Sequence, residues 1–141
     1  MKFPDAEIKL GKDTDASAII QFWKENNISL SGTDNAIEVA EAAKVFPELF
    51  LVAFHEGKIA GTVWGNFDGR RGFVVHFAVR KDLRKLGLGK MLMDKLEDAF
   101  RALGCKKIHL FIEKTNLVVE SYYDRRGFKR RDDLIIMSKD L

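Results

Sequence analysis

The sequence contains one cysteine and two prolines among 141 residues. Cys105 has no second thiol with which to form an internal disulfide or a paired zinc site. No apolar run approaches the roughly 18 residues that a membrane-spanning helix needs, and the opening segment Met1-Lys2-Phe3-Pro4 lacks the apolar stretch of a signal peptide. We therefore expect a cytoplasmic protein that has no disulfide and no membrane partner.

The sequence also has little excess charge: 24 lysines and arginines oppose 21 aspartates and glutamates, which gives a net charge of +3. A balance this close gives the chain as a whole no electrostatic footprint for nucleic acid, and we expect no such partner. The basic residues do gather near 80–90 and near 125–131. Solvated surface charge is the ordinary interpretation of the second group, and RNA binding is its minor alternative.

What is present is the composition of an ordinary globular protein, with 46% hydrophobic and 32% charged residues. A chain of this length can bury about two thirds of the surface that its unfolded form exposes. It contains no internal repeat and no linker rich in proline or serine at which it could be divided. We therefore expect one domain over residues 1–141.

Hydrophobic periodicity predicts both strands and helices. Apolar residues recur at helical spacing from Leu88 to Leu103 and stop at Gly104, while Glu56-Gly57 and Asp68-Gly69 mark turns between antiparallel strands. The strands are expected near Glu7–Leu10, Leu49–Phe54, Lys58–Trp64, Phe73–Val79, Lys107–Ile112 and Leu134–Ser138. The other helices are expected from Asp13 or Thr14 to about Asn26, from Asn35 to Phe46 and from Leu117 to Arg126. This mixture is typical of an α+β fold.

The segment Arg84-Lys85-Leu86-Gly87-Leu88-Gly89 joins the strand ending at Val79 to the longest helix. Glycines let backbone N–H groups approach a ligand closely. The first turn of a helix has N–H donors without intrahelical partners and a partial positive charge, and Arg84, Lys85 and Lys90 add full charges. The junction therefore predicts a site for an anion such as a pyrophosphate.

Two common phosphate motifs do not fit this segment. A P-loop needs glycine where Arg84 stands and serine or threonine where Met91 stands. A dinucleotide-binding fingerprint needs a third glycine where Leu92 stands, and it should lie in a strand–helix–strand unit rather than after a meander of antiparallel strands. The pattern that remains is Arg-x-x-Gly-x-Gly after a strand.

A second segment follows along the chain, with Asn116, then Tyr123, then Gly127-Phe128. The order Asn…Tyr-x-x-x-Gly-Phe, downstream of Arg-x-x-Gly-x-Gly, resembles the GNAT superfamily of N-acetyltransferases. The likeness is strongest to short bacterial and archaeal members with an Asp-Gly-x-Arg-Gly turn, here at 68–72. It implies the GNAT fold, in which a central, mostly antiparallel mixed sheet of six to seven strands is flanked by about four helices.

The resemblance also implies an activity: direct transfer of the acetyl group of acetyl-CoA to an amine, on a small molecule or a protein, without a metal. Backbone groups of Phe77, Ala78 and Val79 would contact the pantetheine arm, Asn116 would hydrogen-bond it, and Tyr123 would lie beside the thioester sulfur. The cofactor-binding loop would comprise Arg84, Lys85, Leu86, Gly87, Leu88, Gly89 and Lys90. The expected partners are acetyl-CoA and an amine acceptor, and a homodimer is left open.

The base that deprotonates the acceptor is the least defined part of this hypothesis. One branch of the family has a glutamate base where this chain has Phe111. Glu113 lies two residues further, on the same face of the expected strand, and is our candidate; a water relay can replace any side-chain base. We interpret His76, which should share a face with Val74, as a buried histidine with one hydrogen bond. A non-catalytic module that binds acetyl-CoA or CoA is the alternative to an enzyme.

Overall fold

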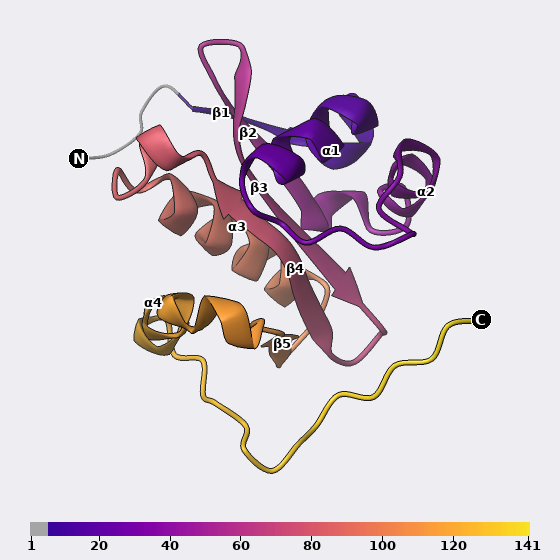
Figure 1. Ribbon diagram of the computed structural model, residues 1–141, viewed down its shortest axis with the longest axis vertical. Coiled ribbons are helices and arrows are strands. Elements are labelled where there is room, and N and C mark those ends of the chain that lie inside the picture. The colour runs from indigo at the N-terminus through magenta and orange to yellow at the C-terminus, as the bar shows by residue number, and fades with distance from the viewer. Residues whose placement is uncertain (1–5) are drawn as a thin grey trace. The chain divides into compact units, whose positions relative to one another are not determined.

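The computed structural model describes residues 6–141 (Figure 1). Backbone contacts divide the chain into two units, one ending at Leu110 and the other comprising Phe111–Leu141. The opening segment, for which the sequence predicts no signal peptide, lies outside the described residues. Within 6–141, no helix is both long enough and apolar enough to cross a membrane.

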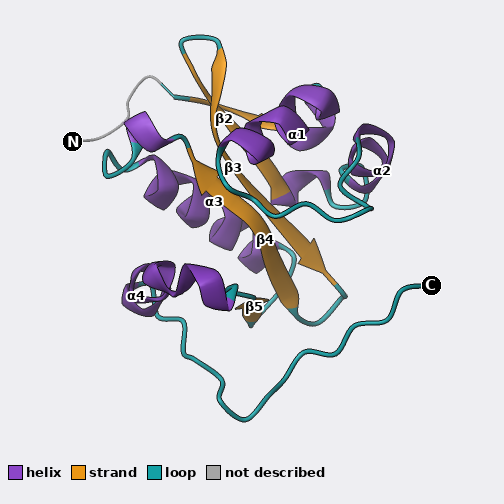
Figure 2. Ribbon diagram, viewed as in Figure 1, coloured by secondary structure: helices purple, strands orange, loops and turns teal. Residues whose placement is uncertain are grey.

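The first unit contains a five-stranded sheet with the order β1-β2-β3-β4-β5 (Figure 2). Its strands are β1 (Glu7–Leu10), β2 (Phe50–His55), β3 (Lys58–Phe67), β4 (Gly72–Val79) and β5 (Ile108–Leu110). The strands from β1 to β4 pair antiparallel, and β5 pairs parallel to β4. The helices of this unit are α1 (Ala16–Glu25), α2 (Ala36–Ala42) and α3 (Leu88–Ala102).

The second unit contains a 3₁₀ helix, Lys114–Val119, followed directly by α4 (Glu120–Arg125). Gly127 ends this helical segment with φ of 96°, and the Phe128 N–H donates to the Tyr123 carbonyl at 3.1 Å. A glycine in the left-handed region is the common way to end a helix, because it has no Cβ to strain. From residue 128 onward the chain contains neither helix nor strand.

The α+β class, the mixed and mostly antiparallel sheet and the four α-helices are confirmed for residues 6–141. The expected strand count of six to seven is wrong for this part of the chain, which forms five strands. The strand expected at Leu134–Ser138 is absent there, and Ile135 and Met137 are 85% and 87% exposed. Apolar residues favour a strand only when a neighbouring strand and a packed face receive them, and this segment has neither within the described residues.

Two helix boundaries differ from the expected ones for local reasons. The N-cap of α1 is Asp15, whose side chain accepts from the Ser17 N–H, whereas the expected Thr14 donates its hydroxyl to the Leu10 carbonyl. Helix α2 ends at Ala42 rather than Phe46. Phe46 precedes a proline and has φ of −130° and ψ of 76°, because the residue before proline is driven out of the helical region.

Helix α3 packs closely on one face of the sheet because that face carries glycines. A Cβ built on Gly65 would lie 2.6 Å from Cζ of Phe100, and one built on Gly61 would lie 2.9 Å from Cδ1 of Leu92. A Cβ on Gly72 would also collide with the Phe100 ring. Leu92 and Phe100 are almost fully buried as a result.

Helices α1 and α2 cover the opposite face of the sheet (Figure 1). Trp23 of α1 is fully buried, and its indole N–H donates to the hydroxyl of Thr62 at 2.9 Å. The Phe50 and Trp64 rings stack at 4.2 Å between centroids. Both hydrogen-bonding groups of the Trp23–Thr62 pair are therefore satisfied inside an apolar layer, which removes the penalty for burying them.

Candidate functional site

The junction between β4 and α3 has the conformation expected of a ligand-binding loop. Helix α3 begins at Leu88, as predicted, and Gly87 is its N-cap with φ of 93°. The Gly87 carbonyl accepts the first helical hydrogen bond, from the Met91 N–H at 3.0 Å. Lys85 also has positive φ, 63°, which costs a non-glycine residue about 1 kcal/mol or more. Two residues with positive φ, one of them a glycine, therefore lie in the turn that precedes α3.

The first turn of α3 presents unused hydrogen-bond donors. The N–H groups of Leu88, Gly89 and Lys90 precede the first intrahelical bond, and no side chain caps the helix at Gly87. None of the three amides donates a hydrogen bond within residues 6–141. A helix of 15 residues concentrates partial positive charge at these donors. The loop therefore has the donors and the field that bind an anion.

The side chains around this turn are held by the protein. A Cβ built on Gly89 would lie 3.1 Å from Cζ of Phe77, so the Phe77 ring lies directly under the first turn of α3. Arg84 donates from Nε to the Val79 carbonyl at 3.0 Å, and Lys90 pairs with a carboxylate one turn along α3 at 2.7 Å. The Phe77 and Arg84 contacts join the end of β4 to the loop.

Strand β4 has an open edge next to this loop. Strand β5 pairs only with Gly72, Phe73 and Val74. The remaining residues of β4, 75–79, have no strand partner on that side in the described part of the chain. A sheet edge that no neighbouring strand occupies can receive an extended ligand by the hydrogen bonds that such a strand would make. Phe77, Ala78 and Val79 lie in this open stretch.

A β-bulge divides β4 at His76. Val75 lies opposite Trp64 and Ala78 lies opposite Thr62, so two residues of β4 lie opposite one of β3. His76 has φ of 50°. A bulge interrupts the alternation of side chains, which corrects our expectation that His76 shares a face with Val74: His76 and Val75 line one cavity on the side of α2.

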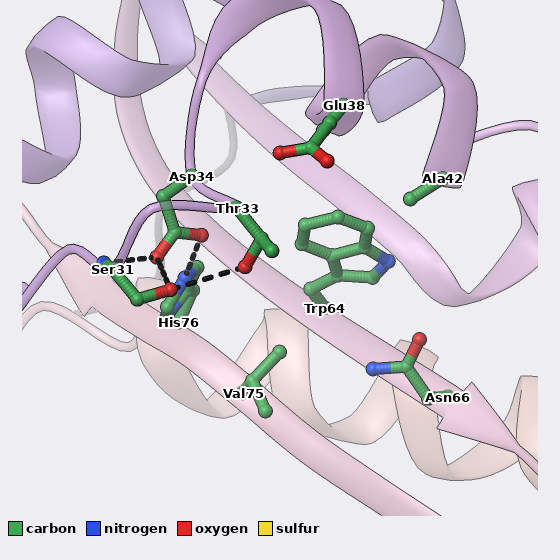
Figure 3. A pocket seen from close by; sticks show the side chains of 9 residues that line it. All are labelled: Ser31, Thr33, Asp34, Glu38, Ala42, Trp64, Asn66, Val75 and His76. Atoms are coloured by element: carbon green, nitrogen blue, oxygen red, sulfur yellow. Dashed lines mark hydrogen bonds and ion pairs between the residues drawn. The ribbon is translucent and has the colours of Figure 1, made fainter. Parts of the chain in front are cut away.

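His76 binds Asp34, which lies in the turn before α2 (Figure 3). The distance from His76 Nε2 to Asp34 Oδ1 is 2.8 Å, and the two side chains are 19% and 11% exposed. The edge of the imidazole packs on Trp23 with centroids 4.4 Å apart. The expectation of one hydrogen bond to His76 is confirmed, but its partner lies 42 residues away and could not be found from local sequence.

Asp34 is ionised in this arrangement. Burial raises the pKa of Asp34, but hydrogen bonds outweigh this effect and hold the pKa below its ordinary value. The donors are the Ser31 N–H, at 2.8 Å, and the His76 ring. A lowered pKa means that the carboxylate form stabilises the folded state above the ordinary pKa of aspartate, about 3.9.

We therefore expect Asp34→Asn to destabilise the protein by up to about 1 kcal/mol at pH 5. The difference should be smaller at pH 3, because the carboxyl of the unfolded chain is then mostly protonated and the stabilisation declines as the pH falls toward the lowered pKa of Asp34. Urea unfolding of both proteins at the two pH values measures it. A difference that stays constant with pH would assign the effect to shape rather than to charge.

A cavity of about 340 Å³ opens beside this pair. It lies between α2, the turn before it, and strands β3 and β4 (Figure 3). We call it the His76 cavity; its lining residues are Ser31, Thr33, Asp34, Glu38, Ala42, Trp64, Asn66, Val75 and His76. Its size and its mixture of one indole with several polar groups are typical of a small-molecule site. The sequence analysis missed this cavity, because its walls come from segments distant in the chain.

Three predicted site residues lie in the second unit. Glu113 immediately precedes the 3₁₀ helix and lies outside β5, so the strand alternation that we used to choose it does not apply. Asn116 lies within that helix at a non-helical φ of −127°. Tyr123 lies in α4, and its ring packs edge-on against Phe128 with centroids 5.6 Å apart. The roles predicted for these three residues stay predictions.

The hydroxyl of Tyr123 is held in its neutral form. Burial raises the pKa of Tyr123 well above the ordinary value of a tyrosine, and the neighbouring Tyr122 adds to the effect. A neutral hydroxyl can donate one hydrogen bond. Because the pKa is raised, complete transfer of its proton is less favourable than for an ordinary tyrosine.

The second basic group of the sequence carries its own counterions. Arg130 pairs with Asp132 at 2.9 Å, and Arg131 holds both oxygens of Asp133 at 2.9 and 2.8 Å. These exposed pairs lower the positive charge that the segment presents to a polyanion.

The structure groups no set of metal ligands in the part of the chain that it describes: within residues 6–141, no three His, Cys, Asp or Glu side chains gather as a metal ion would require.

Comparisons with known proteins agree with this architecture. The model of the Acetyltransferase (GNAT) family matches residues 16–128. An acetyltransferase of Pectobacterium atrosepticum is 32% identical over 126 residues, which cover 89% of each chain. An acetyltransferase structure from Streptococcus agalactiae gives a TM-score of 0.77 at 17% identity over 99% of this chain and 93% of that one.

A structure from Clostridium acetobutylicum, described as an acetyltransferase with acetyl-CoA, gives a TM-score of 0.67 at 16% identity over 94% of both chains. At such identities the two structures show a shared fold. The family match and the relative from P. atrosepticum go further, since each spans most of the chain. The chain therefore belongs to the Acetyltransferase (GNAT) family.

Proposed function

We propose that the protein transfers the acetyl group of acetyl-CoA directly to an amine. The observation that carries this proposal is the row of unused N–H donors at Leu88, Gly89 and Lys90, next to the open edge of β4. A diphosphate matches the donors in charge, and an arm containing amides matches a strand edge that no β-strand occupies. Acetyl-CoA carries both groups, and the similar structure from C. acetobutylicum was solved with it.

The first unit would hold acetyl-CoA mainly through its backbone. The N–H groups from Leu86 to Lys90 would bind the diphosphate, and the backbone of 77–79 would bind the pantetheine arm. Gly87 supplies the positive φ with which the loop enters α3, and Gly89 lets the first turn of α3 pack on Phe77 of the strand that would hold the arm. Holding the thioester in a fixed place lets the amine attack it without a covalent enzyme intermediate.

In the second unit, Asn116 would hydrogen-bond the arm, and the neutral Tyr123 hydroxyl would donate to the departing sulfur. Donation stabilises charge that develops on sulfur in the transition state. Glu113 remains the candidate base of our sequence hypothesis, with a water relay as its alternative. Cytoplasmic location and a homodimer likewise remain predictions.

The experiment that tests the proposal measures thiol release from acetyl-CoA with a panel of amines. The panel contains alkylamines, diamines, aminoglycosides and peptides with free N-termini. The expected result is thiol release that depends on the amine, with a product heavier by one acetyl group. Binding of acetyl-CoA with no acetylated product from any amine would favour the non-catalytic module.

Tyr123→Phe is expected to lower kcat by about tenfold to a hundredfold without abolishing activity. The phenylalanine keeps the ring packing and removes one hydrogen bond to the sulfur. The expected loss of rate is at the lower end of what a positioned donor contributes. Steady-state kinetics with the best amine of the panel measures the change. Tyr122→Phe serves as the matched control, because it removes a neighbouring hydroxyl that we place outside the site.

An unchanged kcat in Tyr123→Phe would contradict the role of the hydroxyl. The affinity for acetyl-CoA should change little, because the hydroxyl acts on the reacting sulfur rather than on the diphosphate. A large loss of affinity together with a lowered melting temperature would assign Tyr123 to the structure of α4 instead.

A further inference from the structure

The His76 cavity is acidic although the protein is basic. Its ionisable lining groups are Asp34, Glu38 and His76, and none of the described residues lining it is lysine or arginine. When His76 is uncharged, the cavity lining carries two negative charges, whereas the whole chain has a net charge of +3. Trp64 adds an aromatic surface, which favours alkyl chains and cations. The cavity therefore selects for a positively charged small molecule.

The cavity also adjoins the strand that we propose for acetyl-CoA. His76 immediately precedes Phe77, and the bulge directs His76 into the cavity while Phe77 packs under α3. Positive φ at His76 is a strained conformation, which structures retain where a side chain must be aimed. One short stretch of β4 thus borders both the open strand edge and the acidic cavity.

The hydrogen bond to Asp34 determines which nitrogen of His76 can accept a proton. Because Asp34 is ionised, it accepts from Nε2–H at 2.8 Å, and the neutral ring then carries its lone pair on Nδ1. Nδ1 makes no hydrogen bond within residues 6–141. This is the arrangement by which a carboxylate orients an imidazole that acts as a base.

We propose, on the basis of the proposed function, that the His76 cavity binds the acceptor and that the acceptor is a small amine with a second positive charge. In this proposal His76, in place of Glu113 or a water relay, is the catalytic base that takes a proton from the reacting ammonium. Asp34 is a positioning residue that holds the imidazole. Glu38, in the first turn of α2, binds the second ammonium, and its position is set by the Asn35 side chain, which donates to it at 2.7 Å.

The step balances with acetyl-CoA as the only co-reactant. His76 removes one proton from the ammonium, and the nitrogen lone pair forms the C–N bond at the thioester carbonyl. The C–S bond breaks with its electrons on sulfur, which receives the second N–H proton as the thiol forms. The imidazole then releases its proton to solvent. The products are the N-acetyl amine, CoA and one proton.

The charge selectivity is tested with three molecules of equal chain length: butylamine, diaminobutane and γ-aminobutyrate. We expect kcat/KM to be highest for diaminobutane, about tenfold above butylamine, since one charge-assisted hydrogen bond is worth about that factor. γ-Aminobutyrate should be poorest, because its carboxylate faces two others. Glu38→Gln should remove the advantage of diaminobutane over butylamine.

Glu41→Gln is the matched control for Glu38→Gln. It makes the same substitution on α2 at an exposed carboxylate that pairs with Lys44 and does not line the cavity. This variant should keep the full preference for diaminobutane. Glutamine at 38 can still accept from Asn35, so the cap of α2 is preserved.

The base is tested by the pH dependence of kcat/KM in His76→Asn. Asparagine tolerates the positive φ of this position but does not titrate. The ionisable groups facing the imidazole are Asp34 from the turn and Glu38 from α2, while α1 contributes the non-titrating Trp23. We expect kcat/KM to fall about a hundredfold. The decline of kcat/KM at low pH that the imidazole causes should also disappear, so that the remaining pH dependence comes from the amine itself.

Asp34→Asn gives a second variant in case His76→Asn folds poorly. It should lower kcat/KM by about tenfold and shift the decline of kcat/KM at low pH, because the imidazole loses its anionic partner. Three results would overturn this inference. The first is equal kcat/KM for diaminobutane and butylamine, and the second is an equal loss for all three molecules in Glu38→Gln. The third is an unchanged decline of kcat/KM at low pH in both His76→Asn and Asp34→Asn. Failure to acetylate any amine overturns the proposed function instead, so the two failures are distinguishable.

Discussion

Gly89→Glu is expected to abolish the thermal stabilisation that acetyl-CoA gives the wild-type protein. At a concentration of one hundred times Kd, a ligand stabilises the state that binds it by about 2.7 kcal/mol. For a domain of this size that free energy raises the melting temperature by several degrees. The variant should show no shift at the same concentration.

Two effects of the glutamate act together. Its carboxylate, attached within the first turn of α3, would repel the charge of a diphosphate bound at the donors of 88–90. Its Cβ would also press on the Phe77 ring, which lies 3.1 Å from the position that a Cβ takes. The first effect removes the site, and the second disturbs the strand that borders it.

Gly89→Ala separates these effects, because it adds the Cβ without the charge. We expect it to retain part of the acetyl-CoA shift. Differential scanning fluorimetry with and without acetyl-CoA measures all three proteins, and calorimetric titration gives their affinities. A wild-type-like shift in Gly89→Glu would show that the diphosphate binds elsewhere.

Gly65→Ala is expected to destabilise the fold by about 1–3 kcal/mol, the usual cost of an overpacked core. The added methyl would lie 2.6 Å from Cζ of Phe100 and 3.0 Å from Cδ1 of Leu96. Phe100 is 2% exposed, so its ring has little room to move. The sheet and α3 would have to separate, or the ring would have to leave its rotamer.

A double-mutant cycle with Phe100→Leu tests this explanation. The smaller leucine costs stability by itself, but it removes the ring atom that the methyl would meet, so Gly65→Ala should cost less in that background. Gly32→Ala is the matched control, because nothing lies within 4 Å of a Cβ at Gly32. Urea unfolding measures each variant. Equal costs of Gly65→Ala in both backgrounds would contradict the packing argument.

The sequence was informative where structure depends on neighbouring residues. The start of α3 at Leu88 and its end before Gly104 follow from glycine chemistry and helical periodicity, and both are observed. The turn at Glu56-Gly57 is also observed, with positive φ at both residues. These signals are local, so no tertiary contact can easily override them.

Features that depend on distant partners were missed. The bulge at His76 arises from the register between β3 and β4, and the sequence of β4 alone does not mark it. From the local sequence Asp34 is an ordinary turn residue, because its partner His76 is close to it only in the folded protein. The segment after Leu134 has the composition of a strand, but composition cannot supply a neighbouring strand.

The bulge in β4 has a consequence for how the acceptor preference of such a protein can change. If the two reactants are recognised on opposite sides of one strand, substitutions in the turn before α2 can alter which amine enters without touching the glycine turn. A lineage could then exchange one acceptor for another in small steps while the donor chemistry persists. Divergence would be concentrated around Asp34 and Glu38, and the diphosphate cradle would stay constant.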